Sequence, residues 1–166
     1  MSPRTAEFEK DASERPNAKR SRPLTAIAVG GLIVGALDLT YAILVYSPRH
    51  PILIPQTIAS GLLGERAYDG GMATAILGVL LHFTIAFGAA TVYYLASRKI
   101  PFMVTRAFAS GLLYGAMVYG FMQLVVLPLS AAPHHPMALF LRACEFVEHW
   151  FFVGLPIALS VRRYSP

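Results

Sequence analysis

Charged residues are scarce in this chain, and their scarcity excludes an ordinary soluble domain. Asp, Glu, Lys and Arg make up 14% of the 166 residues, whereas 55% are hydrophobic and the mean hydropathy is +0.54. Soluble domains carry about 25% charged residues, so the composition indicates an integral membrane protein. Cysteine is almost absent as well. Cys144 is the only one, which excludes an intrachain disulfide.

The motifs of soluble enzymes are missing too. The sequence contains no phosphate-binding loop, no G-x-S-x-G, no H-E-x-x-H and no paired C-x-x-C. The excess of positive charge does not indicate nucleic-acid binding, because eleven of the fourteen Lys and Arg residues are confined to residues 1–23, 98–106 and 162–163. Such clusters set orientation in a bilayer. The sequence therefore favours a non-enzymatic protein whose partner is the lipid bilayer.

Four apolar stretches are long enough to span a membrane, which requires about 20 helical residues. They cover residues 24–46, 72–95, 108–127 and about 137–161. We expect an all-α membrane domain over 24–163, built as two hairpins, after a polar tail over 1–23 whose composition is typical of disorder. Pro156 predicts a kink in the fourth span, and Pro128 is expected to close the third.

The connection between the first two spans contains a shorter apolar segment. Residues 51–64 are too few to cross a bilayer, so this segment predicts an interfacial or re-entrant helix. Most of the Lys and Arg residues lie at the ends of the predicted spans opposite to this segment. The positive-inside rule then places both termini in the cytoplasm.

Two spans share a glycine pattern. Residues 31–36 read G-L-I-V-G-A and residues 111–116 read G-L-L-Y-G-A, while His82-Phe83 recurs as His149-Trp150. This indicates either a parallel repeat of two hairpins or a chance match between glycine-rich helices. In the first of these spans the stripe of small residues is expected to let a neighbouring helix approach closely, so that Asp38 faces protein and not lipid.

Polar residues interrupt all four spans at nearly one depth. The fourth span contains R-A-C-E-F-V-E-H-W, in which Arg142, Glu145, Glu148 and His149 share one helix face. Ionisable groups at bilayer depth cost roughly 2.5 to 3.5 kcal/mol each and mark functional sites. With a helical rise of about 1.5 Å, one polar residue of each other span reaches a similar depth. The predicted site is Asp38, His82, Gln123, Glu145, Glu148 and His149.

Several interpretations of this cluster remain open. Arg142 can pair with Glu145, and the polar groups then only hold the helices together. Alternatively the cluster handles protons, because histidines and desolvated carboxylates can change protonation near neutral pH. A divalent metal is a third interpretation, with ligands His82, Glu145, Glu148 and His149. Haem between His82 and His149 is disfavoured by the neighbouring acids.

A set of residues in the second half matches a known family pattern. The set comprises His82, Phe87, Pro101, Gly111-Leu112-Leu113, Gly115-Ala116, Pro128-Leu129, Glu145-Phe146, His149 and Arg162-Arg163. With these residues the chain resembles the YagU-type bacterial inner-membrane proteins over 81–163. The resemblance implies an inner-membrane location and an association with acid resistance. Asp38 and Glu148 are not part of that pattern.

The functional prediction is a protonatable intramembrane site formed by His82, Glu145 and His149. Its expected role is proton-linked permeation or an acid-stress response. A non-catalytic accessory subunit of a membrane complex, bound to a partner subunit or to further copies of itself, is the main alternative. An intramembrane metal-binding protein is the second alternative.

Overall fold

The computed structural model describes residues 22–133 and 137–164, and these residues form helices and no strands. Four helical segments are long and apolar enough to cross a membrane: Pro23–Tyr46, Gly71–Ser97, Ala107–Leu129 and Leu139–Tyr164. The predicted all-α, four-span architecture is therefore confirmed, with ends displaced by at most a few residues. Most of the predicted tail lies outside the described residues.

The first two spans are single helices, whereas the last two are interrupted. α2 is Pro23–Tyr46 and α4 is Gly71–Ser97. The third span consists of α6 (Ala107–Phe121), the π-helical η2 (Met122–Val126) and α7 (Leu127–Leu129). The fourth consists of α8 (Leu139–Glu148), the π-helical η3 (His149–Gly154) and α9 (Leu155–Tyr164).

Both π-helical segments end two residues before a proline. The backbone N–H of Leu127 donates to the carbonyl of Met122, and that of Leu155 donates to the carbonyl of Trp150. Each of these bonds reaches back five residues. A proline lacks an N–H and its ring clashes with the carbonyl four residues earlier, so the helix widens just before it. Pro128 thus lies inside α7 rather than closing the third span at residue 127 as expected.

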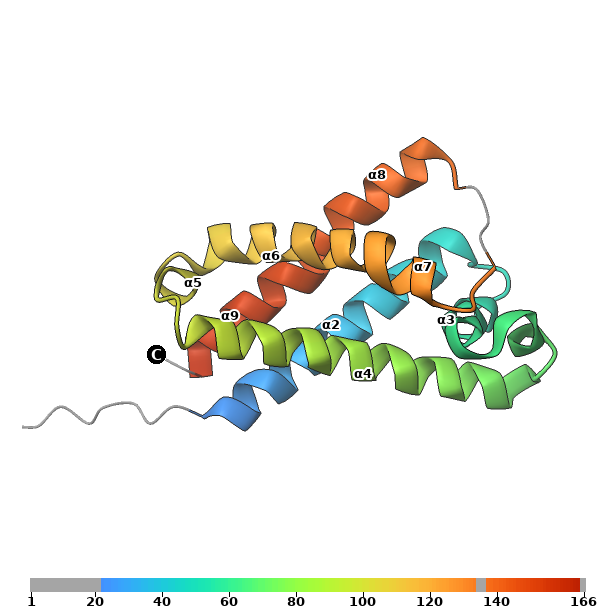
Figure 1. Ribbon diagram of the computed structural model, residues 1–166, viewed down its shortest axis with the longest axis horizontal. Helices are drawn as coiled ribbons and strands as arrows, with labels where there is room; N and C mark the ends of the chain where they lie inside the picture. The colour runs from blue at the N-terminus through green and yellow to red at the C-terminus, as the bar shows by residue number, and fades with distance from the viewer. Residues whose placement is uncertain (1–21, 134–136, 165–166) are drawn as a thin grey trace, which may run out of the picture.

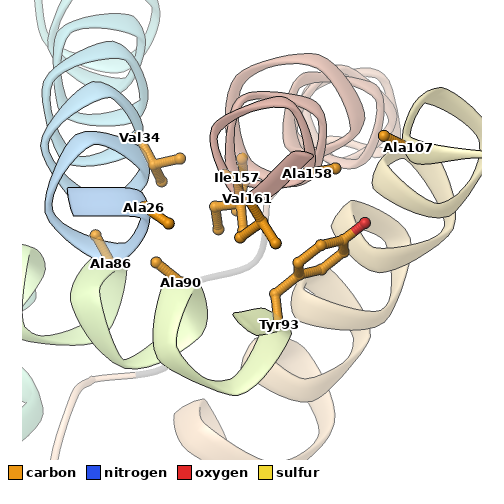
Figure 2. Close-up of a cluster of buried hydrophobic side chains, with 10 residues drawn as sticks. Ala26, Val34, Ala86, Ala90, Tyr93, Ala107, Ile157, Ala158 and Val161 are labelled. Carbon is orange, nitrogen blue, oxygen red and sulfur yellow. The ribbon is translucent and has the colours of Figure 1, made fainter. Parts of the chain in front are cut away.

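The helices pack as a bundle in which α2 contacts α4 and α9, and α9 also contacts α6 (Figure 1). The core is made mainly of small side chains (Figure 2). Its members are at most 5% exposed: Ala26, Val34, Ala86, Ala90, Tyr93, Ala107, Val153, Ile157, Ala158 and Val161. The Tyr93 hydroxyl bonds to the carbonyl of Met103 and to Ser110 Oγ, each at 2.8 Å.

One end of the bundle carries most of the positive charge and is called the basic end below. The N–H of Arg22 donates to the carbonyl of Tyr164 at 2.8 Å, which places the start of α2 beside the end of α9. The connection between α4 and α6, which includes α5 (Phe102–Thr105), lies at the same end (Figure 1). The described residues of this end are Arg22, Arg98, Lys99, Arg106, Arg162 and Arg163.

The opposite end contains the short helix expected between the first two spans. α3 is Leu53–Leu63 and is followed by the 3-10 turn η1 (Gly64–Tyr68). α3 packs along α4, where the Pro55 carbonyl faces Gly78 and leaves no space for a side chain. The Gln56 amide donates to the carbonyl of Gly71 at 3.1 Å. A non-spanning helix in this connection is therefore confirmed.

The two glycine stripes play different parts in packing. Gly111 and Gly115 lie against the backbone of η3 and α9, as a close approach between helices requires. Gly31 and Gly35 instead receive the rings of Phe87 and Phe83 from α4. A neighbouring helix thus approaches both stripes: its backbone does so in the third span, and its aromatic rings fill the space beside Gly31 and Gly35 in the first.

Candidate intramembrane acid–histidine site

Three predicted residues come together near the middle of the bundle. Asp38 extends from α2, while Glu148 and His149 lie where α8 becomes η3. One side-chain oxygen or nitrogen from each of the three lies within 4.8 Å of the others. This group is called the Asp38 cluster below. It joins two spans that are distant in the sequence.

The His149 ring is held by contacts on two sides. Its Nδ1 donates to the backbone carbonyl of Glu145 at 2.9 Å, one turn earlier in the helix. Its ring and that of Tyr119 pack in a T-shaped arrangement, with centroids 5.4 Å apart. These contacts fix the ring next to Glu148, whose Oε2 is 2.8 Å from the same Nδ1.

Glu148 is the most unusual group of the site. Its side chain is 2% exposed, and neither carboxyl oxygen has a hydrogen-bond partner among the described residues. The short distance to His149 does not provide one, because the Nδ1 proton is directed at the Glu145 carbonyl instead. Buried polar atoms are hydrogen-bonded in most proteins, so an exception requires an explanation.

His82 reaches the cluster from α4. Its Nε2 donates to the backbone carbonyl of Gly35 at 3.0 Å and lies 3.7 Å from Asp38 Oδ2. The Phe83 ring covers Gly35 from the same helix. His82 therefore lies next to Asp38, and its Nε2 proton is used in a hydrogen bond to the α2 backbone.

Glu145 forms a separate contact on the side of the third span. The amide of Gln123, in η2, lies 3.4 Å from both Glu145 carboxyl oxygens. Among the described residues Gln123, and not Arg142, is the hydrogen-bond partner of this carboxylate. The expected pair between Arg142 and Glu145 is thus replaced by an amide contact.

The structure divides the six predicted residues into two groups. Asp38, Glu148 and His149 form the cluster with His82 beside Asp38, while Glu145 pairs with Gln123. The sequence-based metal set omitted Asp38 and included Glu145 and His82. Sequence reasoning also missed the carbonyls of Gly35 and Glu145, which orient the two histidines. Main-chain acceptors of this kind leave no signal in residue types.

Close helix packing positions the fourth span at this point. A side chain at Gly115 would collide with the carbonyl of His149, and one at Gly154 would collide with the backbone of Gly111 and Gly115. The contact therefore locks α6 against η3. Because η3 begins at His149, its wider turn changes the direction of every later side chain relative to α8.

The donor set defines what the Asp38 cluster can hold. Two carboxylates and one imidazole supply oxygen and nitrogen ligands suited to a divalent metal, and the same groups can bind protons. The side chains of Glu148, His149 and Asp38 are 2%, 11% and 23% exposed, so the cluster is largely shielded from its surroundings.

These features define a multi-pass α-helical membrane protein with an acid–histidine cluster between its spans. Comparisons with protein-family models, with curated proteins and with solved structures found no match.

Proposed function

We propose that this chain is a small multi-pass protein of the bacterial inner membrane whose acid–histidine cluster serves proton-linked permeation or an acid-stress response. The resemblance to YagU-type proteins supports the location and the association with acid. His82, Glu145 and His149, which carry that resemblance, all belong to or adjoin the site.

The observation that carries the proposal is the buried Glu148 carboxylate beside Asp38. Two carboxylates so close together in a low-dielectric interior cannot both remain charged without a cation. Among the described residues, the ion-pair partners of Asp38 and Glu148 are the histidines His82 and His149, and neither carboxylate pairs with Lys or Arg. The positive charge must therefore come from the neighbouring histidines or from a bound ion, of which the proton is the smallest.

The charge distribution supports an orientation with both termini in the cytoplasm. The basic end carries Arg22, Arg98, Lys99, Arg106 and the pair Arg162-Arg163. The opposite end carries Arg49, Arg66 and Arg142. Clusters of Lys and Arg in short loops remain on the cytoplasmic side, so an ion reaching the cluster from the opposite end comes from outside.

A flux assay tests the proposal. Purified protein is reconstituted into liposomes that contain a pH-sensitive dye, and internal pH is followed after an external acid jump. The full chain should acidify the lumen faster than empty liposomes, and Glu148→Gln should remove most of that increase. Asp69→Asn, at an exposed acid outside the spans, is the matched control and should behave as the unmodified protein.

Two outcomes would reject proton handling. Flux equal to that of empty liposomes, with and without candidate solutes, leaves the accessory-subunit interpretation. Flux that is unchanged in Glu148→Gln removes the cluster from the function. Under the accessory interpretation, a second membrane protein should remain bound to the chain after mild detergent extraction.

A further inference from the structure

The Asp38 cluster has the spacing of a metal-ligand set. Protein ligands lie about 2.0 to 2.2 Å from Zn²⁺, so neighbouring ligand atoms are about 3 to 3.5 Å apart around one ion. Each of the three residues offers one side-chain oxygen or nitrogen atom, and these atoms lie within 4.8 Å of one another. The three donor atoms are therefore close enough for small side-chain rotations to bring them to one ion.

Glu148 provides a second and independent observation. Its two carboxyl oxygens are buried, have no hydrogen-bond donor among the described residues and lie within the cluster. A buried carboxylate that only held helices together would be expected to accept hydrogen bonds. A metal ion satisfies such oxygens without any donor.

The charge of the cluster selects a divalent ion. Asp38 and Glu148 contribute two negative charges, and a neutral imidazole contributes none, so a divalent cation makes the group neutral. A monovalent cation would leave one uncompensated charge at a depth where each costs several kcal/mol. The imidazole favours zinc or iron, and the two carboxylates also suit manganese. Magnesium is disfavoured because it prefers oxygen ligands and retains its waters.

The surrounding contacts resemble those that hold ligands in metal sites. Metal-bound histidines are usually oriented by a hydrogen bond from the ring to a carbonyl or carboxylate. The His149 ring donates to the Glu145 carbonyl, and His82 lies 3.7 Å from Asp38 while bonding to Gly35. His82 is therefore a positioning residue, and the Glu145 carboxylate, which contacts Gln123, takes no part.

We propose that the Asp38 cluster binds one divalent transition-metal ion through Asp38, Glu148 and a ring nitrogen of His149. Three protein ligands leave a coordination position for water or a further ligand, as in catalytic zinc sites. The inference rests on the proposed function, since the ion is then the species whose permeation is linked to protons.

Metal binding to the purified full chain tests this inference. Chelator-treated protein in detergent is dialysed against Zn²⁺ or Mn²⁺, with Mg²⁺ as the comparison ion, and bound metal is measured by elemental analysis. About one Zn²⁺ or Mn²⁺ per chain is expected, with little Mg²⁺. Co²⁺ added to the same protein should produce visible absorption bands characteristic of mixed nitrogen and oxygen ligation.

Matched variants identify the ligands. Asp38→Asn and Glu148→Gln should each weaken Zn²⁺ binding at least 100-fold, and His82→Asn should weaken it about 10- to 100-fold, as outer contacts of metal sites do. Glu145→Gln, one turn away on the same helix, should bind as the unmodified protein does. A symmetric elution peak in size-exclusion chromatography shows that each variant is folded.

Two results would overturn the inference. One is a folded full chain that binds none of these ions stoichiometrically. The other is an equal loss of metal in Glu145→Gln and Glu148→Gln. The proposed function is tested separately. Proton flux that depends on Glu148 in a chain that binds no metal would support the function and reject the metal site. Stoichiometric metal binding without Glu148-dependent proton flux would support the metal site and reject the function.

Discussion

The carbonyl oxygen of His149 lies where a side chain on Gly115 would have to be. Gly115→Ala must therefore push η3 away from α6 and displace the Asp38 cluster with it. We expect a loss of about 1 to 3 kcal/mol in unfolding free energy, the usual cost of overpacking, together with weaker Zn²⁺ binding. Thermal unfolding in detergent and metal analysis measure the two effects.

The matched control is Gly120, five residues further along the same helix. A methyl group at Gly120 would meet nothing within 4 Å, and alanine is favoured over glycine in a helix by about 1 kcal/mol. Gly120→Ala should therefore leave stability unchanged or raise it. Equal melting temperatures for the two variants would contradict the locking of α6 against η3.

Replacing Glu148 should stabilise the metal-free protein. Glu148→Leu removes a buried carboxylate that has no hydrogen-bond donor among the described residues, and His149 keeps its bond to the Glu145 carbonyl. An unsatisfied buried group costs about 1 to 3 kcal/mol, so a gain of that size in unfolding free energy is expected in chelator.

When metal is added, the unmodified chain should become more stable than Glu148→Leu. At about 100 times its dissociation constant, a ligand stabilises the folded state by about 2.7 kcal/mol. Zn²⁺ should therefore raise the melting temperature of the unmodified chain and leave that of Glu148→Leu unchanged. A lower melting temperature for Glu148→Leu in chelator would show that the carboxylate is satisfied after all.

The Tyr93 hydroxyl should contribute more to the unfolding free energy than the hydroxyl of Tyr94. Tyr93 is fully buried and its hydroxyl joins the carbonyl of Met103 to Ser110. Tyr93→Phe should lower the unfolding free energy by about 1 to 2 kcal/mol, and Ser110, which also donates to Met103, limits the loss. Tyr94→Phe, at a partly exposed position, should change it by less than about 0.5 kcal/mol.

The orientation can be tested with single cysteines. In a Cys144→Ala background, His50→Cys and Lys99→Cys place exposed thiols at opposite ends of the bundle. A membrane-impermeant maleimide added to spheroplasts should label His50→Cys at once and Lys99→Cys only after lysis. The opposite pattern would reverse the assignment of the basic end to the cytoplasm.

The four spans could be predicted from the sequence because hydrophobic length alone determines them. The composition of the site could be predicted in part, since the cost of intramembrane charge draws attention to every ionisable residue. Which of these residues contact one another could not be predicted. Asp38 belongs with Glu148 and His149 only because of how α2 and η3 are rotated, and that rotation depends on packing.

The two prolines show why the rotation was hidden. Pro156 predicted a disturbed helix, but its effect is a wider turn that begins at His149, within the site itself. The matching turn before Pro128 faces the same region and carries Gln123. Each wide turn shifts the helix face by a fraction of a turn, so an ideal helical wheel does not give the directions of the side chains that follow it.

The small side chains between the Asp38 cluster and the basic end determine how anything could pass. Ala26, Ala86, Ala90 and Ala158 are at most 4% exposed and lie on three different helices (Figure 2). Alanine has no side-chain rotation that could open a path, so the helices themselves would have to separate. Motions of that kind take microseconds to milliseconds. The rate of transport through this bundle would then be limited by helix motion, as in a carrier, and would be far lower than that of an open pore.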